Sequence, residues 1–354
     1  MTETPDDGVD PEVDSVVVAR PAEEHDLLDL LEERLLGAAP TLTQEQVAER
    51  SGVPLELARE LWRQLGFAAT APGEVAFTEA DVEAVRLTHD LIELGVLSAD
   101  RQEGLVRTWG RSFARLAEWQ AALLADVALE SGMDVRVALD VLGQEALPRV
   151  EKLQGYTWRR HLLSAAGRLL VDRSDAHAAG VCFVDIVGYT SRSRTLDETE
   201  LVEWLEAFET RALVTVVEHR GRIIKNIGDE LLIVADSPQD IAEIALELVS
   251  RGQDPEDDFP AVRAGVTYGD VVSRLGDVYG PVVNIAARLT SVARPGTVLI
   301  DRGLHAALGG RPEPAEGEPT DDDHAEESAY RFRRLRRVSV KGYSRLHVWV
   351  LSRR

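Results

Sequence analysis

Hydrophobic and polar residues follow a helical period through the first half of the chain. One apolar face recurs at intervals of three and four residues, through Leu27, Leu28, Leu31 and Leu35. Thr43, followed three residues later by Gln46, is a capping-box signal and predicts that a helix begins there. Further helices are predicted over 55–65, 79–94, 100–131, 135–153 and 157–170. The pattern therefore predicts an all-α first half.

The pattern changes near His177. Residues 179–187 form an almost continuous apolar run rich in valine, which predicts a buried strand. Later elements are predicted as helices over 197–219, 238–251 and 282–291, and as strands over 221–226, 230–235, 262–268, 271–274, 297–300 and 346–351. The order β-α-β-β-α-β is typical of a ferredoxin-like domain. The predicted fold class is therefore α+β, with a ferredoxin-like domain preceded by an all-α domain.

These patterns divide the chain into four parts. Residues 1–24 are acidic and poor in aromatic side chains, so we expect a disordered tail. An all-α domain is predicted over 25–155 and a linker helix over 156–176. The ferredoxin-like domain is predicted over 177–354, and its segment 309–328, rich in Gly, Pro, Asp and Glu, is expected to be a flexible insert.

Charge and composition narrow the classes of function. The 354 residues include 39 basic and 62 acidic side chains, for a formal net charge of -23, which disfavours nucleic acid and anionic membranes as partners. The chain contains no run of about 18 or more uncharged apolar residues, so no membrane span is predicted. Cys182 is the single cysteine and excludes an intrachain disulfide, so we expect a cytoplasmic protein in which Cys182 packs in the core.

A DNA-binding function is the first alternative to weigh. Residues 43–66 are similar to a helix-turn-helix. The second helix, however, carries charges of both signs, on Glu56, Arg59, Glu60 and Arg63. A helix that enters a DNA groove normally carries an excess of positive charge, so DNA binding is disfavoured.

Two carboxylates stand where chemistry is expected. Asp185 ends the buried strand 179–187, where an unpaired charge is costly. Asp229 lies at the tip of the predicted hairpin, which can approach the end of that strand. Two carboxylates brought together repel each other unless divalent cations lie between them, and oxygen ligands of this kind suit Mg²⁺ or Mn²⁺. Gly188 and Thr190 follow Asp185 just before a helix, so backbone N–H groups can face an anion there.

Four motifs in one order resemble a known family. They are FVDIVGYT, KNIGDE, GDVYGPVVNIAARL and ARPG. Over roughly residues 177–351 the chain resembles the catalytic domain of class III adenylate and guanylate cyclases. The resemblance implies that Asp185, Ile186 and Asp229 form a site for two Mg²⁺ or Mn²⁺ ions. It also implies that the triphosphate of the nucleotide contacts Gly188, Tyr189, Thr190 and Lys341.

The same resemblance implies which nucleotide is used. Lys225 and Asp277 match the pair that selects adenine, since Lys donates to a ring nitrogen and Asp accepts from the exocyclic amine. Guanine carries a carbonyl where adenine carries that amine. The expected reaction is therefore ATP to 3′,5′-cyclic AMP and pyrophosphate. A guanylate cyclase and a catalytically silent nucleotide-binding regulatory module remain alternatives.

Asn284 and Arg288 match the pair that acts on the transition state. In the family Asn orients the ribose, and Arg stabilises charge on the α-phosphoryl group. Being four residues apart, they share one face of a helix. Family members take this pair from a second subunit, so a chain with one complete set of residues is expected to be a homodimer with ATP bound at its interface.

The first half resembles the regulatory domain of some bacterial cyclases, including a pH-responsive mycobacterial type. The resemblance rests on 48–67 and on Phe77-Thr78-Glu79-Ala80-Asp81. It implies autoinhibition by the helical domain. A pH response needs a group that titrates near neutrality, and His161, beside Arg159 and Arg160 in the segment joining the two halves, is our candidate. An apolar ligand in the helical half is an open alternative.

Overall fold

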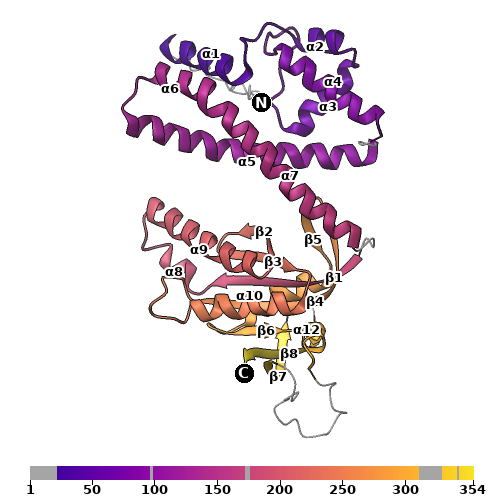
Figure 1. Cartoon of the computed structure of the whole chain (residues 1–354), viewed down its shortest axis with the longest axis vertical. Helices are drawn as coiled ribbons and strands as arrows, with labels where there is room; N and C mark the ends of the chain where they lie inside the picture. The colour runs from indigo at the N-terminus through magenta and orange to yellow at the C-terminus, as the bar shows by residue number, and fades with distance from the viewer. Residues whose placement is uncertain (1–21, 96–98, 172–175, 311–328, 341–342) are drawn as a thin grey trace, which may run out of the picture. The chain divides into compact units, whose positions relative to one another are not determined.

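The computed structural model describes residues 22–95, 99–171, 176–310, 329–340 and 343–354. The chain forms two compact units, Met1–Ala166 and Gly167–Arg354, which are described separately (Figure 1). Residues 1–21 of the predicted acidic tail, 311–328 of the predicted insert and Lys341 lie outside the described residues. None of the described helices is both long enough and apolar enough to cross a membrane.

The N-terminal unit is helical. Its elements are α1 (Ala22–Leu36), α2 (Gln44–Ser51), α3 (Leu55–Leu65), α4 (Glu79–Glu93), α5 (Ala99–Ser131), α6 (Val135–Val141), a π-helical turn (Leu142–Ala146) and α7 (Leu147–Val171). Thr43 and Gln46 form the predicted capping box at the start of α2. The predicted break between 153 and 157 is wrong, because α7 is continuous through Gly155. A glycine inside a helix costs only about 1 kcal/mol, which a helix of this length tolerates.

A small core holds α2, α3, α4 and α5 together. Trp62 stacks on Phe77 with ring centroids 4.6 Å apart. Leu42 forms a β-bridge with Phe77 and is buried with them, as is Val106 from α5. The predicted linker helix over 156–176 overlaps α7, while the domain borders stay predictions.

The C-terminal unit is built on one sheet. Its strands are β1 (Ala176–Ile186), β2 (Arg222–Ile227), β3 (Glu230–Ala235), β4 (Val262–Arg274), β5 (Asp277–Tyr279), β6 (Val298–Ile300), β7 (Tyr330–Val340) and β8 (Tyr343–Arg353). The strand order is β2-β3-β1-β4-β6-β8-β7, and β5 pairs with β4. Its helices are α8 (Tyr189–Arg192), α9 (Glu198–Glu218), α10 (Pro238–Arg251), α11 (Pro281–Val292) and α12 (Arg302–Ala307). The strand β1 is central and pairs antiparallel with β3 and β4.

Alternate residues of β1 enter different cores. Cys182 and Val184 pack under α9 and α10, while Val181 and Phe183 pack with side chains of α11 on the other face. Cys182 is fully buried, as predicted for a core residue, and burial raises the pKa of its thiol. The helix α11 lies so close to β4 that a Cβ on Gly265 would clash with backbone atoms of α11. This contact fixes α11 against the sheet.

Two predictions about strands need correction. The strands predicted over 262–268 and 271–274 are one strand, β4, because its ladder with β1 continues through the pair Ala179–Gly269. The pattern also failed to predict β5, β7, α8 and α12. The strand β5 and the helix α8 are three and four residues long, too short for a periodic pattern to develop.

Candidate active site

Asp185 lies near the end of β1, between two charged residues on the neighbouring strands. The strand register sets Asp185 opposite Glu230 of β3 and opposite Arg263 of β4, so all three side chains share the face of the sheet that α11 covers. Nε and Nη2 of Arg263 are each 2.6 Å from Oδ2 of Asp185. The Asp185 side chain is 15% exposed, so the ion pair offsets the cost of burying a carboxylate.

The hairpin between β2 and β3 brings Asp229 to the same place. Gly228 has a φ of +65°, which a glycine adopts without strain and which lets the chain turn in two residues. The carbonyl of Asp229 accepts a hydrogen bond of 3.3 Å from the backbone N–H of Ile186. Burial, together with the charge of Asp185 and a hydrogen bond to it, raises the pKa of Asp229. Asp185 and Asp229, predicted from the sequence to meet, thus lie beside each other.

Glu230 adds a third carboxylate to this region. Burial, followed by the charges of Asp185 and Asp229, raises its pKa to about 7. Burial therefore acts first to raise these pKa values, and mutual repulsion between the carboxylates adds to it, while Arg263 acts in the opposite direction. A divalent cation would supply further positive charge.

The donor set fits Mg²⁺ or Mn²⁺ in an open site. Asp185 and Asp229 offer hard oxygen ligands, and Mg²⁺ commonly binds through one or two carboxylates together with phosphate oxygens of the substrate. Within the described ranges, the one group of three metal-ligating side chains within 4.8 Å of one another is His89, Asp90 and Glu93, in the N-terminal unit. Two carboxylates alone leave most of the coordination positions of such an ion to water or to phosphate oxygens of a substrate.

A second pair of charged residues comes from the strands β2 and β5. Nζ of Lys225, on β2, is 2.5 Å from Oδ2 of Asp277, on β5. The backbone N–H of Val278 donates to the other carboxylate oxygen at 2.9 Å. Burial acts to raise the pKa of Asp277, but the hydrogen bond and charge of Lys225 outweigh it, and the net effect is a lowered pKa. The sequence analysis assigned these two residues to adenine and did not predict their contact with each other; their role in base selection stays a prediction.

Asn284 and Arg288 lie on α11, on the side away from the sheet. The helix buries Val282, Ala286 and Leu289, whereas Asn284 is exposed and Arg288 is half-buried. Among the described residues, no hydrogen bond or ion pair joins their side chains to Asp185, Asp229 or Lys225. The structure of one chain therefore does not bring this pair to the carboxylates.

The segment after Asp185 turns sharply into α8. Gly188 has a φ of +76°, and its carbonyl accepts hydrogen bonds from Ser191 and Arg192. Tyr189 is directed to Trp204 of α9, while Thr190 is exposed. The backbone N–H of Val187 donates a 2.8 Å hydrogen bond to the carbonyl of Ala261, in the segment between α10 and β4. The turn is thus anchored beside Asp185.

Comparisons with known proteins show the family of the chain. The adenylate and guanylate cyclase catalytic domain matches residues 171–353, and an adenylate cyclase regulatory domain matches residues 8–152. An adenylate cyclase of Glutamicibacter nicotianae is 39% identical over 298 residues, which cover 78% of this chain and 74% of that protein. The chain belongs to the class III adenylate cyclase family. Both the catalytic and the regulatory resemblance seen in the sequence are confirmed.

Two further proteins are similar to this chain. A pH-sensitive adenylate cyclase of Mycobacterium tuberculosis is 30% identical over 288 residues, covering 77% of this chain and 71% of that protein. Among solved structures, the guanylate cyclase domain of RhGC from Catenaria anguillulae, in complex with GTP, covers 50% of this chain and 97% of that domain. Its TM-score is 0.42 and its sequence identity is 18%.

Sequence reasoning missed Arg263 and the role of Glu230 in the cyclase. Arg263 is a charged residue inside the apolar run of β4, and that position was the available signal. Its partner could not be read from the sequence, because the register between β1 and β4 joins residues 78 positions apart. Glu230 follows Asp229 directly, but only the hairpin geometry turns it toward Asp185.

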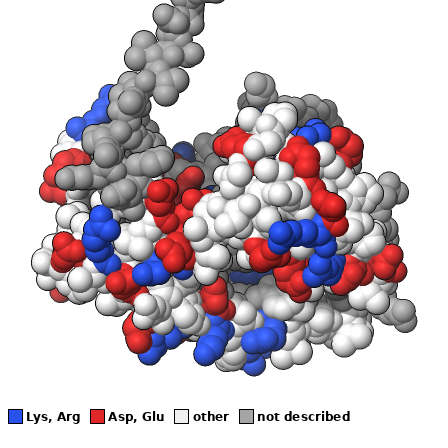
Figure 2. Space-filling model, turned by 90° about the horizontal axis from the view of Figure 1, so that it is seen from above, with Lys and Arg blue, Asp and Glu red and all other residues white. Residues whose placement is uncertain are grey.

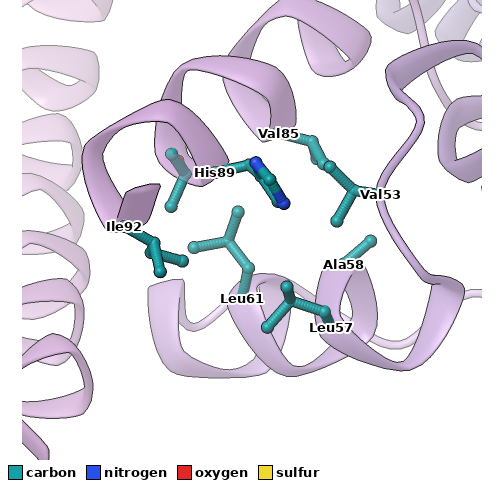
Figure 3. Close-up of a pocket in the computed structure, with 8 residues that line it drawn as sticks. Val53, Leu57, Ala58, Leu61, Val85, His89 and Ile92 are labelled. Carbon is teal, nitrogen blue, oxygen red and sulfur yellow. The ribbon is translucent and has the colours of Figure 1, made fainter. Parts of the chain in front are cut away.

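The N-terminal unit has a small apolar hollow between α3 and α4. Its lining is largely aliphatic, from Val53, Leu57, Ala58, Leu61, Val85 and Ile92, and His89 directs its ring into it (Figure 3). His161 is exposed on α7. In the view of Figure 2 the basic side chains stand among acidic ones, and the described side chains seen there form no broad positive area.

Proposed function

We propose that this cyclase converts ATP to 3′,5′-cyclic AMP and pyrophosphate, with two metal ions at the interface of a homodimer. The observation that carries the proposal is the presence of two residue pairs in one unit: Asp185 beside Asp229, and Lys225 bonded to Asp277. The first pair suits cations and phosphate, and the second suits a purine edge.

The metal-binding part of the site would consist of Asp185, Asp229 and the backbone of Ile186. Mg²⁺ or Mn²⁺ bound there would make the ribose 3′-hydroxyl easier to deprotonate and neutralise charge on the triphosphate. Arg263 holds one oxygen of Asp185 and thereby orients the other. Gly188, Tyr189, Thr190 and Lys341 are proposed to contact the triphosphate.

Selection of adenine is assigned to Lys225 and Asp277. Each is the other's partner before nucleotide binds, and the lowered pKa keeps Asp277 ionised, so that it can only accept hydrogen bonds. The exocyclic amine of adenine donates to such a group, whereas the carbonyl of guanine at that position would face a second acceptor. The mismatch would set two acceptors against each other with no hydrogen between them, which strongly disfavours GTP.

Dimerisation is proposed because Asn284 and Arg288 turn away from their own sheet. Apolar side chains are also exposed on β2, β4 and β5, where Ile227 is 48%, Val272 47% and Tyr279 52% exposed. A twofold axis would bury such side chains against a second copy and bring each copy's Asn284 and Arg288 to the other's carboxylates. Arg288 would then stabilise charge developing on the α-phosphoryl group, and Asn284 would orient the ribose.

Control by the N-terminal unit, through pH, completes the proposal. It is supported by the matched regulatory domain and by the pH-sensitive relative. His161 is the proposed titrating group, since α7 leads from the N-terminal unit to β1 and His161 is accessible to solvent on it.

Complementation between two inactive variants tests the site and the dimer together. Asp229→Asn and Arg288→Ala are each purified and assayed with ATP or GTP and Mn²⁺, alone and after mixing. Each alone should be inactive. Equal mixing should restore about one quarter of the wild-type cyclic AMP formation, because half of the dimers then hold one intact site. No recovery, with dimers shown to exchange, would exclude a site shared between subunits, and cyclic GMP as the main wild-type product would exclude selection of ATP.

A further inference from the structure

Trp204 joins the helix α9 to the short helix α8. Its ring lies nearly parallel to that of Tyr189, with 9° between the planes and 6.2 Å between the centroids. The guanidinium carbon of Arg192 lies 4.9 Å from the centroid of the Trp204 ring. Trp204 and Tyr189 are half-buried and pack against the main core of the unit. One side chain therefore contacts both the first and the last residue of α8.

The helix α8 needs such a contact. It contains four residues, Tyr189–Arg192, and a single helical turn is unstable in water because few hydrogen bonds offset the ordering of its backbone. Its local bonds run from Ser191 and Arg192 to the carbonyl of Gly188, and from Ser193 to that of Tyr189. Aromatic stacking and a cation over a ring each add stabilisation comparable to a hydrogen bond. The Trp204 contacts are thus strong enough to decide whether α8 is formed.

We propose that Trp204 is a positioning residue for nucleotide binding. It holds the segment 188–190 in its binding conformation before ATP arrives. This inference rests on the proposed function, which assigns that segment to the triphosphate. If the segment is in the competent conformation only part of the time, the apparent affinity falls in proportion to that fraction. The bound complex is the same once formed, so the loss appears in KM and not in kcat.

The experiment compares Trp204→Leu with Phe208→Leu. Phe208 lies one turn further along α9 and packs against Phe259, with ring centroids 5.3 Å apart and the planes tilted by 41°, so its loss also removes an aromatic contact of α9 but leaves α8 untouched. Trp204→Leu should raise the KM for ATP roughly five- to tenfold, with kcat within about twofold of wild type. The dissociation constant of 3′-deoxy-ATP, which cannot cyclise, should rise by the same factor. Phe208→Leu should lower Tm with KM unchanged.

Three outcomes would overturn the proposal. They are an unchanged KM in Trp204→Leu, a fall in kcat alone, or an equal rise of KM in Phe208→Leu. Trp204→Phe keeps a flat ring and should recover most of the affinity; a KM as high as that of Trp204→Leu would contradict a stacking role.

Thr190→Val distinguishes the role of Trp204 from the assignment of segment 188–190 to the triphosphate, because it changes the segment itself. If Thr190→Val and Trp204→Leu both leave KM unchanged, the assignment of the segment to the triphosphate is wrong; if only Thr190→Val raises KM, the role of Trp204 is wrong.

Discussion

Lys225 and Asp277 are 52 residues apart in sequence, yet Nζ and Oδ2 lie 2.5 Å apart across the edge of the sheet. Each is the hydrogen-bonding partner of the other until a purine replaces part of the contact. The two residues proposed to select the base therefore position each other, and we expect a change in either to alter selectivity more than stability.

Asp277→Asn should reduce the preference for ATP over GTP. An amide both donates and accepts, so it can face the guanine carbonyl, and the charge that attracts Lys225 is lost. We expect the ratio of kcat/KM for ATP to that for GTP to fall roughly tenfold or more. The matched control is Asp236→Asn, which removes a carboxylate that directly follows β3 and is paired with Arg222 of β2 at 3.0 Å. An unchanged ratio in Asp277→Asn would argue against base recognition by this pair.

Asp229→Asn should lose activity without losing stability. Burial and the neighbouring Asp185 raise the pKa of Asp229, so its ionised form is unfavourable in the metal-free fold. Replacing it with a neutral amide should leave Tm in EDTA equal to or above that of wild type, while cyclase activity falls by about three orders of magnitude or more. The rise of Tm on adding Mn²⁺ should also disappear. A marked drop of Tm in EDTA would show that the carboxylate stabilises the fold.

The metal-free protein should become less stable as pH rises from about 4.5 to about 7. The pKa of Glu230 is raised to about 7 from an ordinary value of 4.5, so the folded state binds its proton more tightly than the unfolded state does. The resulting stabilisation is complete below the unfolded pKa and is lost as pH rises through the folded pKa. Tm measured in EDTA should therefore fall across this range, and Glu230→Gln should flatten the curve relative to Glu256→Gln, which alters an exposed residue.

Addition of Mn²⁺ should stabilise the protein more at pH 7.5 than at pH 5.5. A cation binds ionised carboxylates, and at the lower pH it must displace protons from them. A rise of Tm that does not depend on pH would place the cation elsewhere.

His161→Ala should shift the pH–activity curve if His161 is the switch. The imidazole is exposed on α7, so removing it should leave Tm nearly unchanged and make any change in the pH profile attributable to its charge. Activity would be measured between pH 5.5 and 8 for the full chain, with His89→Ala as a comparison for loss of a histidine that faces the apolar hollow. An unaltered profile in His161→Ala would exclude this residue as the sensor.

Most helices and strands could be predicted from local pattern. The capping box at Thr43, the two-residue hairpin at Gly228 and the apolar run of β1 are short-range signals, and each agrees with the fold. The break predicted near Gly155 failed because one glycine is too weak a signal to end a long helix. The two pieces predicted for β4 failed because pairing with β1 extends the strand beyond what its own residues favour.

What the sequence determined by itself was the chemistry: ordered motifs with carboxylates, one lysine–aspartate pair and an Asn–Arg pair on a helix face. What only the tertiary structure decided was which of these groups meet. Arg263 reaches Asp185, and Glu230 joins the carboxylates, because antiparallel register aligns three strands that are distant along the chain. Trp204 contacts α8 because α9 packs across the sheet. Residue type is a local property, whereas distance between residues is set by the packing of the whole unit.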